Sequence, residues 1–264
     1  MQSNHSKPSI NKWAPGLFLG LAALIFLFVI FKTSPYRLLR PYTLTSAEKL
    51  IPGDHRKSPE RSSWQVLIPI EAGASDAFWM DQIPVTMADY LKCTKADSCP
   101  EPQHRGYFDK FLINPIYRWL PVTYISWQNA LDYCTWSGGT LPTEAQWMAA
   151  AGLAAGQTYP WGDCEPSMSL ANYDGFYQGL IPAGWLPEGA SPYGILDMGG
   201  NVREWMMDIL PESAGGSTGE DITRMLKGGG SSDFPQVLEI TARQWHSQHS
   251  AGFNRGFRCV YPAD

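Results

Sequence analysis

The chain has 264 residues and a formal net charge of −5; 17% of its residues are charged and 44% are hydrophobic. This composition excludes a wholly disordered chain, and 25 Gly with 21 Pro exclude a helix bundle because these residues interrupt helices. Five of the 20 basic residues and none of the 25 acidic residues lie in residues 1–40. The remainder is therefore acidic and is not expected to bind nucleic acid.

Residues 13–31 contain no charged side chain and lie between Lys12 and Lys32. As a helix this segment spans about 28 Å, close to the hydrocarbon thickness of a bilayer. The pattern predicts a transmembrane helix that follows a short tail, residues 1–12. A cleaved signal peptide is the alternative, but no small-x-small cleavage site follows the apolar run. Basic residues flank both ends, so the positive-inside rule gives no orientation.

Residues 32–63 are predicted to be a linker, because four prolines and a polar run leave little to bury. The pattern changes at Trp64, where apolar and β-branched residues up to Ile70 predict a strand. The folded domain is therefore assigned to residues 64–264.

Three helices are predicted from their amino-terminal capping residues. Residues 86–92 and 126–136 carry apolar side chains at helical spacing, with Thr86 and Ser126 as caps. The third helix follows Thr143, where Gln146 three residues later completes a capping box.

Six sequence blocks follow one another in the folded part: residues 121–147, 159–162, 193–205, 227–229, 243–245 and 256–258. They include Gly-Asn-Val-Arg-Glu-Trp at 200–205 and Gly-Phe-Arg at 256–258. In this order the blocks resemble the signature blocks of the formylglycine-generating-enzyme, or sulfatase-modifying-factor, family. The resemblance covers residues 64–262 and implies an α+β, loop-rich variant of the C-type-lectin-like fold. The Gly and Pro content independently favours such a fold.

The resemblance also implies several classes of function. Catalytic members oxidise a sulfatase cysteine to formylglycine, with copper held by two cysteines and with molecular oxygen. Other members are iron-dependent sulfoxide synthases, and many are binding or accessory modules. Asp233 and Leu238 stand at the two copper-cysteine positions, and no cysteine lies between Cys164 and Cys259. Because thiolate sulfur selects Cu(I), copper and formylglycine-generating activity are not expected.

The first hypothesis is therefore a membrane-anchored, non-catalytic accessory or binding subunit of an envelope protein assembly. The alternative is an enzyme, a metal-dependent oxidoreductase with unrecognised ligands. A third hypothesis is a maturation factor for an exported protein. Metal content and co-purifying chains separate these classes.

The resemblance implies structural Ca²⁺ held by oxygen ligands in two loops, which is a donor set that suits a hard cation. The first set is Asp197, the carbonyls of Gly200 and Val202, and Glu204. The second set is Asn172, the Tyr173 carbonyl, Asp174 and the Phe176 carbonyl, and it is weakened by a shortened loop. The alternative for Asp197 and Glu204 is that they only satisfy protein donors in a tight turn.

Other polar residues also allow two interpretations. Glu144, Arg243 and Arg258 lie inside hydrophobic blocks and form either a ligand pocket or ion pairs, and we favour ion pairs because a buried charge needs a partner. His246 and His249 form either a metal-binding pair or part of a polar surface loop, and we favour the loop. The aromatic residues Trp127, Trp136, Trp147, Trp161, Trp205 and Trp245 are expected in the core.

By resemblance, Cys134 and Cys259 form a disulfide, and Cys93 with Cys99 is able to close a local loop, which leaves Cys164 unpaired. Disulfides need an oxidising compartment, and calcium also favours the outside of the cell. We therefore expect the domain on the exoplasmic side, periplasmic or extracellular, with residues 1–12 in the cytoplasm. Five reduced thiols in a cytosolic domain are the alternative. The expected partners are the membrane, through residues 13–31, and one or more proteins.

Overall fold

The computed structural model describes residues 55–57, 64–69, 76–103, 115–212, 215–216 and 221–263. Met1–Leu50 and Ile51–Asp264 form separate units, and the first unit lies outside the described residues. The predicted tail and the predicted transmembrane segment, residues 13–31, lie there too. Within the described part, no helix has the length and apolar character needed to cross a membrane.

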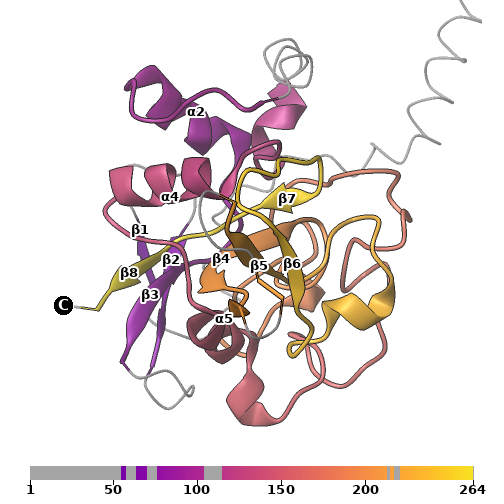
Figure 1. Ribbon diagram of the computed structural model, residues 1–264. Coiled ribbons are helices and arrows are strands. Elements are labelled where there is room, and N and C mark those ends of the chain that lie inside the picture. Colours follow the sequence, from indigo (N-terminus) through magenta and orange to yellow (C-terminus); the bar gives the residue numbers. More distant parts are fainter. Residues whose placement is uncertain are drawn as a thin grey trace, which may run out of the picture. The chain divides into compact units, whose positions relative to one another are not determined.

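One sheet has the strand order β1-β2-β3-β8, with every neighbouring pair antiparallel (Figure 1). Its strands are β1 (His55–Lys57), β2 (Trp64–Ile68), β3 (Phe78–Asp81) and β8 (Val260–Pro262). The strand expected from Trp64 is present. Strand β1 lies inside the predicted linker, residues 32–63, and this polar strand forms by pairing with β2.

The second sheet has the order β6-β5-β4-β7, in which only the β4–β7 pair is parallel. Its strands are β4 (Arg203–Ile209), β5 (Thr223–Lys227), β6 (Gln244–Ser247) and β7 (Arg255–Gly256). In the parallel pair, Arg203 lies opposite Arg255. This register places two guanidinium-bearing residues side by side at the edge of the sheet.

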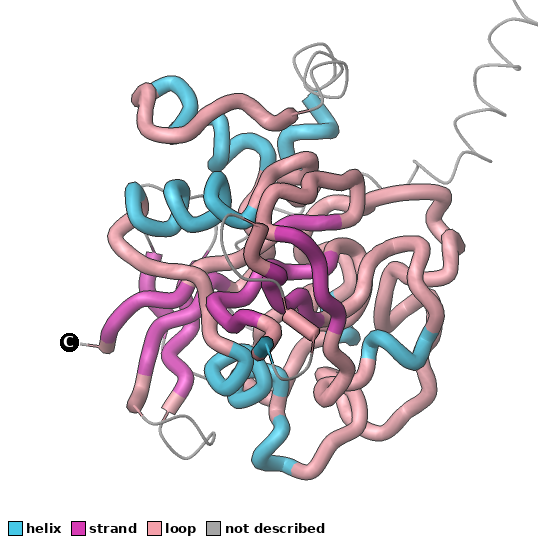
Figure 2. Tube along the Cα trace, in the orientation of Figure 1, coloured by secondary structure: helices cyan, strands magenta, loops and turns pink. Residues whose placement is uncertain are grey.

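The three predicted helices are confirmed as α2 (Met87–Lys95), α4 (Trp127–Trp136) and α5 (Glu144–Ala151). Each begins after its predicted cap, and the hydroxyls of Thr86, Ser126 and Thr143 accept backbone N–H groups at 3.2–3.3 Å. Short 3-10 turns are η4 (Pro115–Trp119), η5 (Leu153–Ala155), η6 (Pro187–Gly189) and η8 (Pro235–Leu238). Loops make up most of the remaining chain (Figure 2), so the domain is a mixed α/β fold with few helices.

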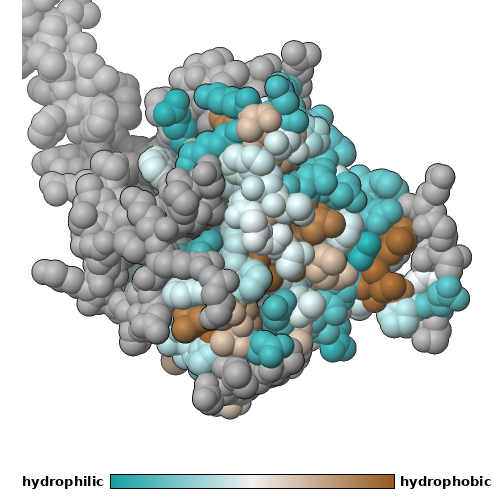
Figure 3. Space-filling view, turned by 90° about the vertical axis from the view of Figure 1, so that its left-hand side faces the viewer, coloured by the Kyte–Doolittle hydropathy of each residue, from teal (hydrophilic) through white to brown (hydrophobic). Residues whose placement is uncertain are grey.

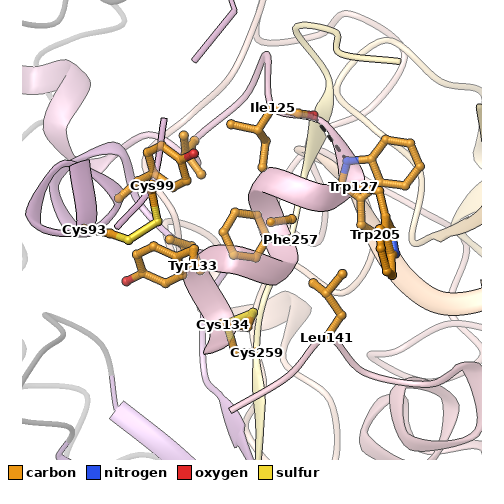
Figure 4. Packing of buried hydrophobic residues seen from close by; sticks show 14 of the residues in the cluster. Cys93, Cys99, Ile125, Trp127, Tyr133, Cys134, Leu141, Trp205, Phe257 and Cys259 are labelled. Atoms are coloured by element: carbon orange, nitrogen blue, oxygen red, sulfur yellow. Dashed lines mark hydrogen bonds between the residues drawn. A yellow bond between two sulfur atoms is a disulfide. The ribbon is translucent and has the colours of Figure 1, made fainter. Parts of the chain in front are cut away.

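One hydrophobic core joins α2 and α4 to residues near the carboxyl terminus (Figure 4). Tyr133 of α4 stacks on Tyr90 of α2 with ring centroids 5.6 Å apart, and Phe257 meets the Tyr133 ring edge-on at 5.4 Å. Both predicted disulfides are present in this region. One joins Cys134 to Cys259 across 125 residues, and the other joins Cys93 to Cys99.

A second core joins the two sheets. Val66 and Met80 of the first sheet pack in one cluster with Met206 and Met225 of the second, and Trp147 of α5 completes it. Trp127, Trp147 and Trp205 are buried as predicted, while Trp136, Trp161 and Trp245 are partly buried.

The surface is mostly hydrophilic on the face shown in Figure 3, with small hydrophobic areas between polar ones. Three phenyl rings of the described part are exposed. They belong to Phe176, Phe234 and Phe253, which are 46%, 69% and 45% exposed.

Candidate functional site

Arg258 and Glu204 form a fully buried ion pair inside the domain. Arg258 Nη2 donates to Glu204 Oε1 at 2.6 Å, and Nε donates to Oε2 at 2.8 Å. Trp147 Nε1 donates to the same carboxylate at 2.9 Å. The remaining Arg258 N–H groups donate to the carbonyls of Asp81, Gln82 and Leu196. Because all five donors of Arg258 are used, this pair fixes the fold and has no capacity left for a ligand.

Lys227 and Glu144 form a second buried pair. Lys227 Nζ donates to the carbonyls of Ile240 and Ala242 at 2.7 Å and lies 3.4 Å from Glu144 Oε1. Arg243 Nε reaches the same oxygen at 2.6 Å. Burial lowers the pKa of Lys227 to about 8, although the Glu144 charge opposes this shift. These contacts support the ion-pair interpretation of Glu144, Arg243 and Arg258.

A third group of charged residues lies at the start of β4. Burial raises the pKa of Asp233, but hydrogen bonds and the positive charge from Arg203 outweigh this effect and hold it below its usual range. Arg203 Nε donates to Asp233 Oδ2 at 2.6 Å, and Nη2 donates to Oδ1. The Gly230 N–H also donates to Oδ2, at 2.7 Å. The Arg203 and Asp233 side chains are 16% and 11% exposed, so solvent reaches this pair.

His246 and Arg255 complete this group. His246 Nε2 lies 3.4 Å from Arg203 Nη1, and Nδ1 lies 3.2 Å from Arg255 Nη2. Burial and the two guanidinium groups lower the pKa of His246, so its ring is neutral at pH 7. Within the described chain Arg255 has no carboxylate at ion-pair distance, and its buried Nε–H has no partner. We call Arg203, Asp233, His246 and Arg255 the arginine cluster.

The position of His246 differs from the predicted polar loop. The residue belongs to β6 and is half-buried, whereas His249 lies beyond the strand and is exposed. The loop interpretation is therefore wrong for His246, because the strand pairing of β5 and β6 carries this residue into the sheet. The described residues contain no group of three His, Cys, Asp or Glu arranged to hold a metal ion.

The first predicted calcium set does not fit calcium at Glu204. Its carboxylate already binds Arg258 and Trp147, so a protein cation occupies the place of a metal ion. Asp197 Oδ2 accepts the Gly184 N–H at 2.6 Å, and burial raises the pKa of Asp197 to about 6. The Gly200 carbonyl accepts the Val202 N–H at 2.8 Å. The structure therefore supports the alternative that these carboxylates satisfy protein donors.

The second set fits a hard cation better. Asn172 is 1% exposed, and its Oδ1 is buried with no hydrogen-bond partner, while its Nδ2 donates to Gly179 at 2.8 Å. The carboxylate of Asp174, two residues later, is exposed. The Tyr173 carbonyl accepts the Phe176 N–H at 3.1 Å and keeps a second lone pair. A buried amide oxygen without a partner, two residues from a carboxylate, supplies oxygen donors of the kind that Ca²⁺ takes.

Comparison with known proteins identifies the family. The sequence matches the sulfatase-modifying factor enzyme 1-like domain over residues 46–263. The chain belongs to this family. The match also begins before Trp64, in agreement with the position of β1.

The relatives that this chain matches include proteins named as formylglycine-generating enzymes and proteins named as inactive. Inactive C-alpha-formylglycine-generating enzyme 2 of Mus musculus is 36% identical over 163 residues, covering 54% of this chain and 50% of the mouse protein. Formylglycine-generating enzyme of Bos taurus is 30% identical over 245 residues, covering 82% of this chain and 59% of the bovine protein. The chain thus matches between half and three fifths of the length of these relatives. PvdO from Pseudomonas aeruginosa shares the fold, with a TM-score of 0.62, 18% identity, and coverage of 79% of this chain and 98% of PvdO.

The two positions that correspond to copper cysteines in catalytic sulfatase-modifying factors do not fit copper here. Asp233 is bound by Arg203 and the Gly230 N–H, and Leu238 is fully buried among Tyr159, Ala171 and Tyr173. Four of the five cysteines form disulfides, and Cys164 is exposed and unpaired. No thiolate pair is available to bind Cu(I) in this structure.

Sequence reasoning did not find the arginine cluster as a unit. Arg203, His246 and Arg255 come from three strands and meet only through the pairing of the second sheet. Two features of the sequence pointed to it. Arg203 occupies the x position of the Gly-Asn-Val-x-Glu-Trp block, and the acidic Asp233 stands at a copper-cysteine position.

Proposed function

We propose that the chain is a non-catalytic, membrane-anchored binding subunit that serves a larger envelope protein assembly. The observation that carries the proposal is the replacement of both copper cysteines by the ion-paired Asp233 and the buried Leu238. A domain without this thiolate pair has lost the metal chemistry of the oxidases but keeps their loop-rich surface. The name of the inactive mouse relative is consistent with this division within the family.

The exoplasmic location of the domain is part of the proposal. Two disulfides support it, because such bonds persist in oxidising compartments. The uncharged run of residues 13–31 supports the anchor. The loop-rich composition and the shared fold with PvdO suit a C-type-lectin-like scaffold, which presents loops to a partner.

Calcium also belongs to the proposal, at the second predicted set. Asn172 Oδ1 and the Asp174 carboxylate, with the Tyr173 and Phe176 carbonyls, would hold the ion. The ion would supply structural support to the loop and satisfy the unpartnered amide oxygen. It would take no part in chemistry, because a hard cation in such a loop acts as a cross-link.

Purification of the full chain from its native membranes in mild detergent tests the binding role. The expected result is elution in a stoichiometric complex with other envelope proteins. Elution as a lone monomer overturns the accessory role. Stoichiometric iron or copper with oxygen consumption favours the oxidoreductase instead, and covalent change in a co-expressed exported protein favours the maturation factor.

A further inference from the structure

The arginine cluster has one more positive charge than the described residues around it neutralise. Arg203 and Arg255 each carry a positive charge, Asp233 carries one negative charge, and His246 is neutral. Both oxygens of Asp233 are already engaged by Arg203. The cluster therefore has a net charge of +1 that no ion pair among the described residues balances.

Arg255 bears this imbalance. Among the described residues, its Nη2 contacts the neutral ring of His246, and its buried Nε–H has no acceptor. Burial and the nearby charge of Arg203 lower the pKa of Arg255, although the charge of Asp233 opposes this shift. Arg258 and Lys227 of the same region differ, since both have carboxylates and every donor in use. Arg224 of β5 also has a buried Nε–H without a partner, but its guanidinium lies over the Trp127 ring and donates to the Met207 carbonyl. An incompletely paired, half-buried guanidinium is typical of a site that an external anion completes.

Exposed phenyl rings lie on the loops that carry and adjoin the cluster. Phe234 follows Asp233 directly, and Phe253 lies two residues before Arg255. The loop of Phe176 is joined to the same place, because the N–H groups of Asp174 and Gly175 donate to the carbonyls of Asp233 and Ser231. Exposed aromatic residues around a partly buried arginine are typical of the centre of a protein interface.

We propose that the arginine cluster binds a carboxylate side chain of a partner protein, in a short segment whose apolar neighbours contact the exposed phenyl rings. This inference rests on the proposed binding role and names the chemistry of the partner. A single carboxylate brings the cluster to neutrality. A phosphate dianion would overcompensate the charge, and a free anion would leave the phenyl rings uncovered.

Calorimetric titration with two capped peptides tests the proposal, using the full chain in detergent. The probes are acetyl-Ser-Phe-Glu-Phe-Ser-amide and the same peptide with Gln in place of Glu. We expect the Glu peptide to bind at least 10-fold more tightly than the Gln peptide. Equal affinities, or no binding of the Glu peptide at millimolar concentration, overturn the proposal.

Variants assign the effect to residues. Arg255→Gln is expected to abolish the difference between the two peptides, whereas Arg118→Gln removes an exposed charge elsewhere and is expected to preserve it. Phe234→Ser is expected to weaken the binding of both peptides and to leave the ratio of their dissociation constants unchanged. If Arg255→Gln fails to fold, Arg255→Lys keeps the charge but loses the forked donor, and we expect it to reduce the ratio severalfold. A ratio unchanged in the folded Arg255 variant refutes the site.

Three further outcomes distinguish failure of this site from failure of the proposed accessory role. Inorganic phosphate that displaces the Glu peptide at equal concentration, with no effect of Phe234→Ser, makes the site one for free anions and overturns the peptide assignment. A native complex that persists in Arg255→Gln refutes this site and leaves the accessory role intact. Selective binding of the Glu peptide by a chain that elutes as a monomer refutes the accessory role alone.

Discussion

The ion pair of Glu204 and Arg258 gives the sharpest prediction for stability. Glu204→Ala leaves the Arg258 guanidinium fully buried, with carbonyl partners but without its ion-pair partner. Breaking a buried pair from one side costs about 3–5 kcal/mol. For a domain of about 200 residues this corresponds to a fall in melting temperature of about 6–20 °C. Trp147 Nε1 also loses its acceptor, which adds to the loss.

Urea unfolding followed by tryptophan fluorescence measures this loss, once in calcium and once in chelator. We expect the same destabilisation in both, because the Glu204 carboxylate is bound by Arg258. Glu188→Ala, at an exposed acidic residue, is the matched control and should change little. The double variant Glu204→Gln/Arg258→Met should lose less free energy of unfolding than the two single variants lose together. A loss below about 1 kcal/mol, or one seen only in calcium, would refute the reasoning.

Three other measurements test separate parts of the account. Glu144→Gln should lower the free energy of unfolding at pH 7, and the difference from the parent chain should shrink below about pH 4. The reason is that a carboxyl group with a lowered native pKa stabilises the fold above its unfolded pKa and loses this effect as the pH falls. A difference in unfolding free energy that is constant with pH contradicts the ion pair. Cys134→Ala/Cys259→Ala should lower the free energy of unfolding by about 5 kcal/mol and Cys93→Ala/Cys99→Ala by about 2 kcal/mol, because the first disulfide closes a longer loop. Mass spectrometry under non-reducing conditions should show alkylation only at Cys164. Asp174→Asn should reduce the rise in melting temperature that calcium produces, and an unchanged rise would exclude the second calcium set.

Local signals in the sequence were enough for the helices. Thr86, Ser126 and Thr143 satisfy the first free N–H groups within three residues of themselves, so their effect is independent of the rest of the fold. The strand β1 has no such signal, because it is polar and depends on pairing with β2.

The candidate site depends on contacts between distant parts of the chain. Arg203 and Arg255 are adjacent only because β4 and β7 pair in parallel, and no spacing in the sequence encodes this register. The same holds for Glu204, whose partner Arg258 is 54 residues away. The family motif indicated that Glu204 was important but not whether its counterion was calcium or arginine, and only the geometry distinguishes the two.

The central claim is that the domain has lost oxidase chemistry, and one experiment tests it most directly. The purified full chain is loaded with Cu(I), dialysed, and analysed for copper, and it is then incubated with oxygen and a sulfatase-derived cysteine peptide. We expect less than 0.1 copper per chain, on the order of background binding, and no formylglycine by mass spectrometry, because Asp233 and Leu238 offer no thiolate pair. About one copper per chain together with formylglycine formation would contradict the account.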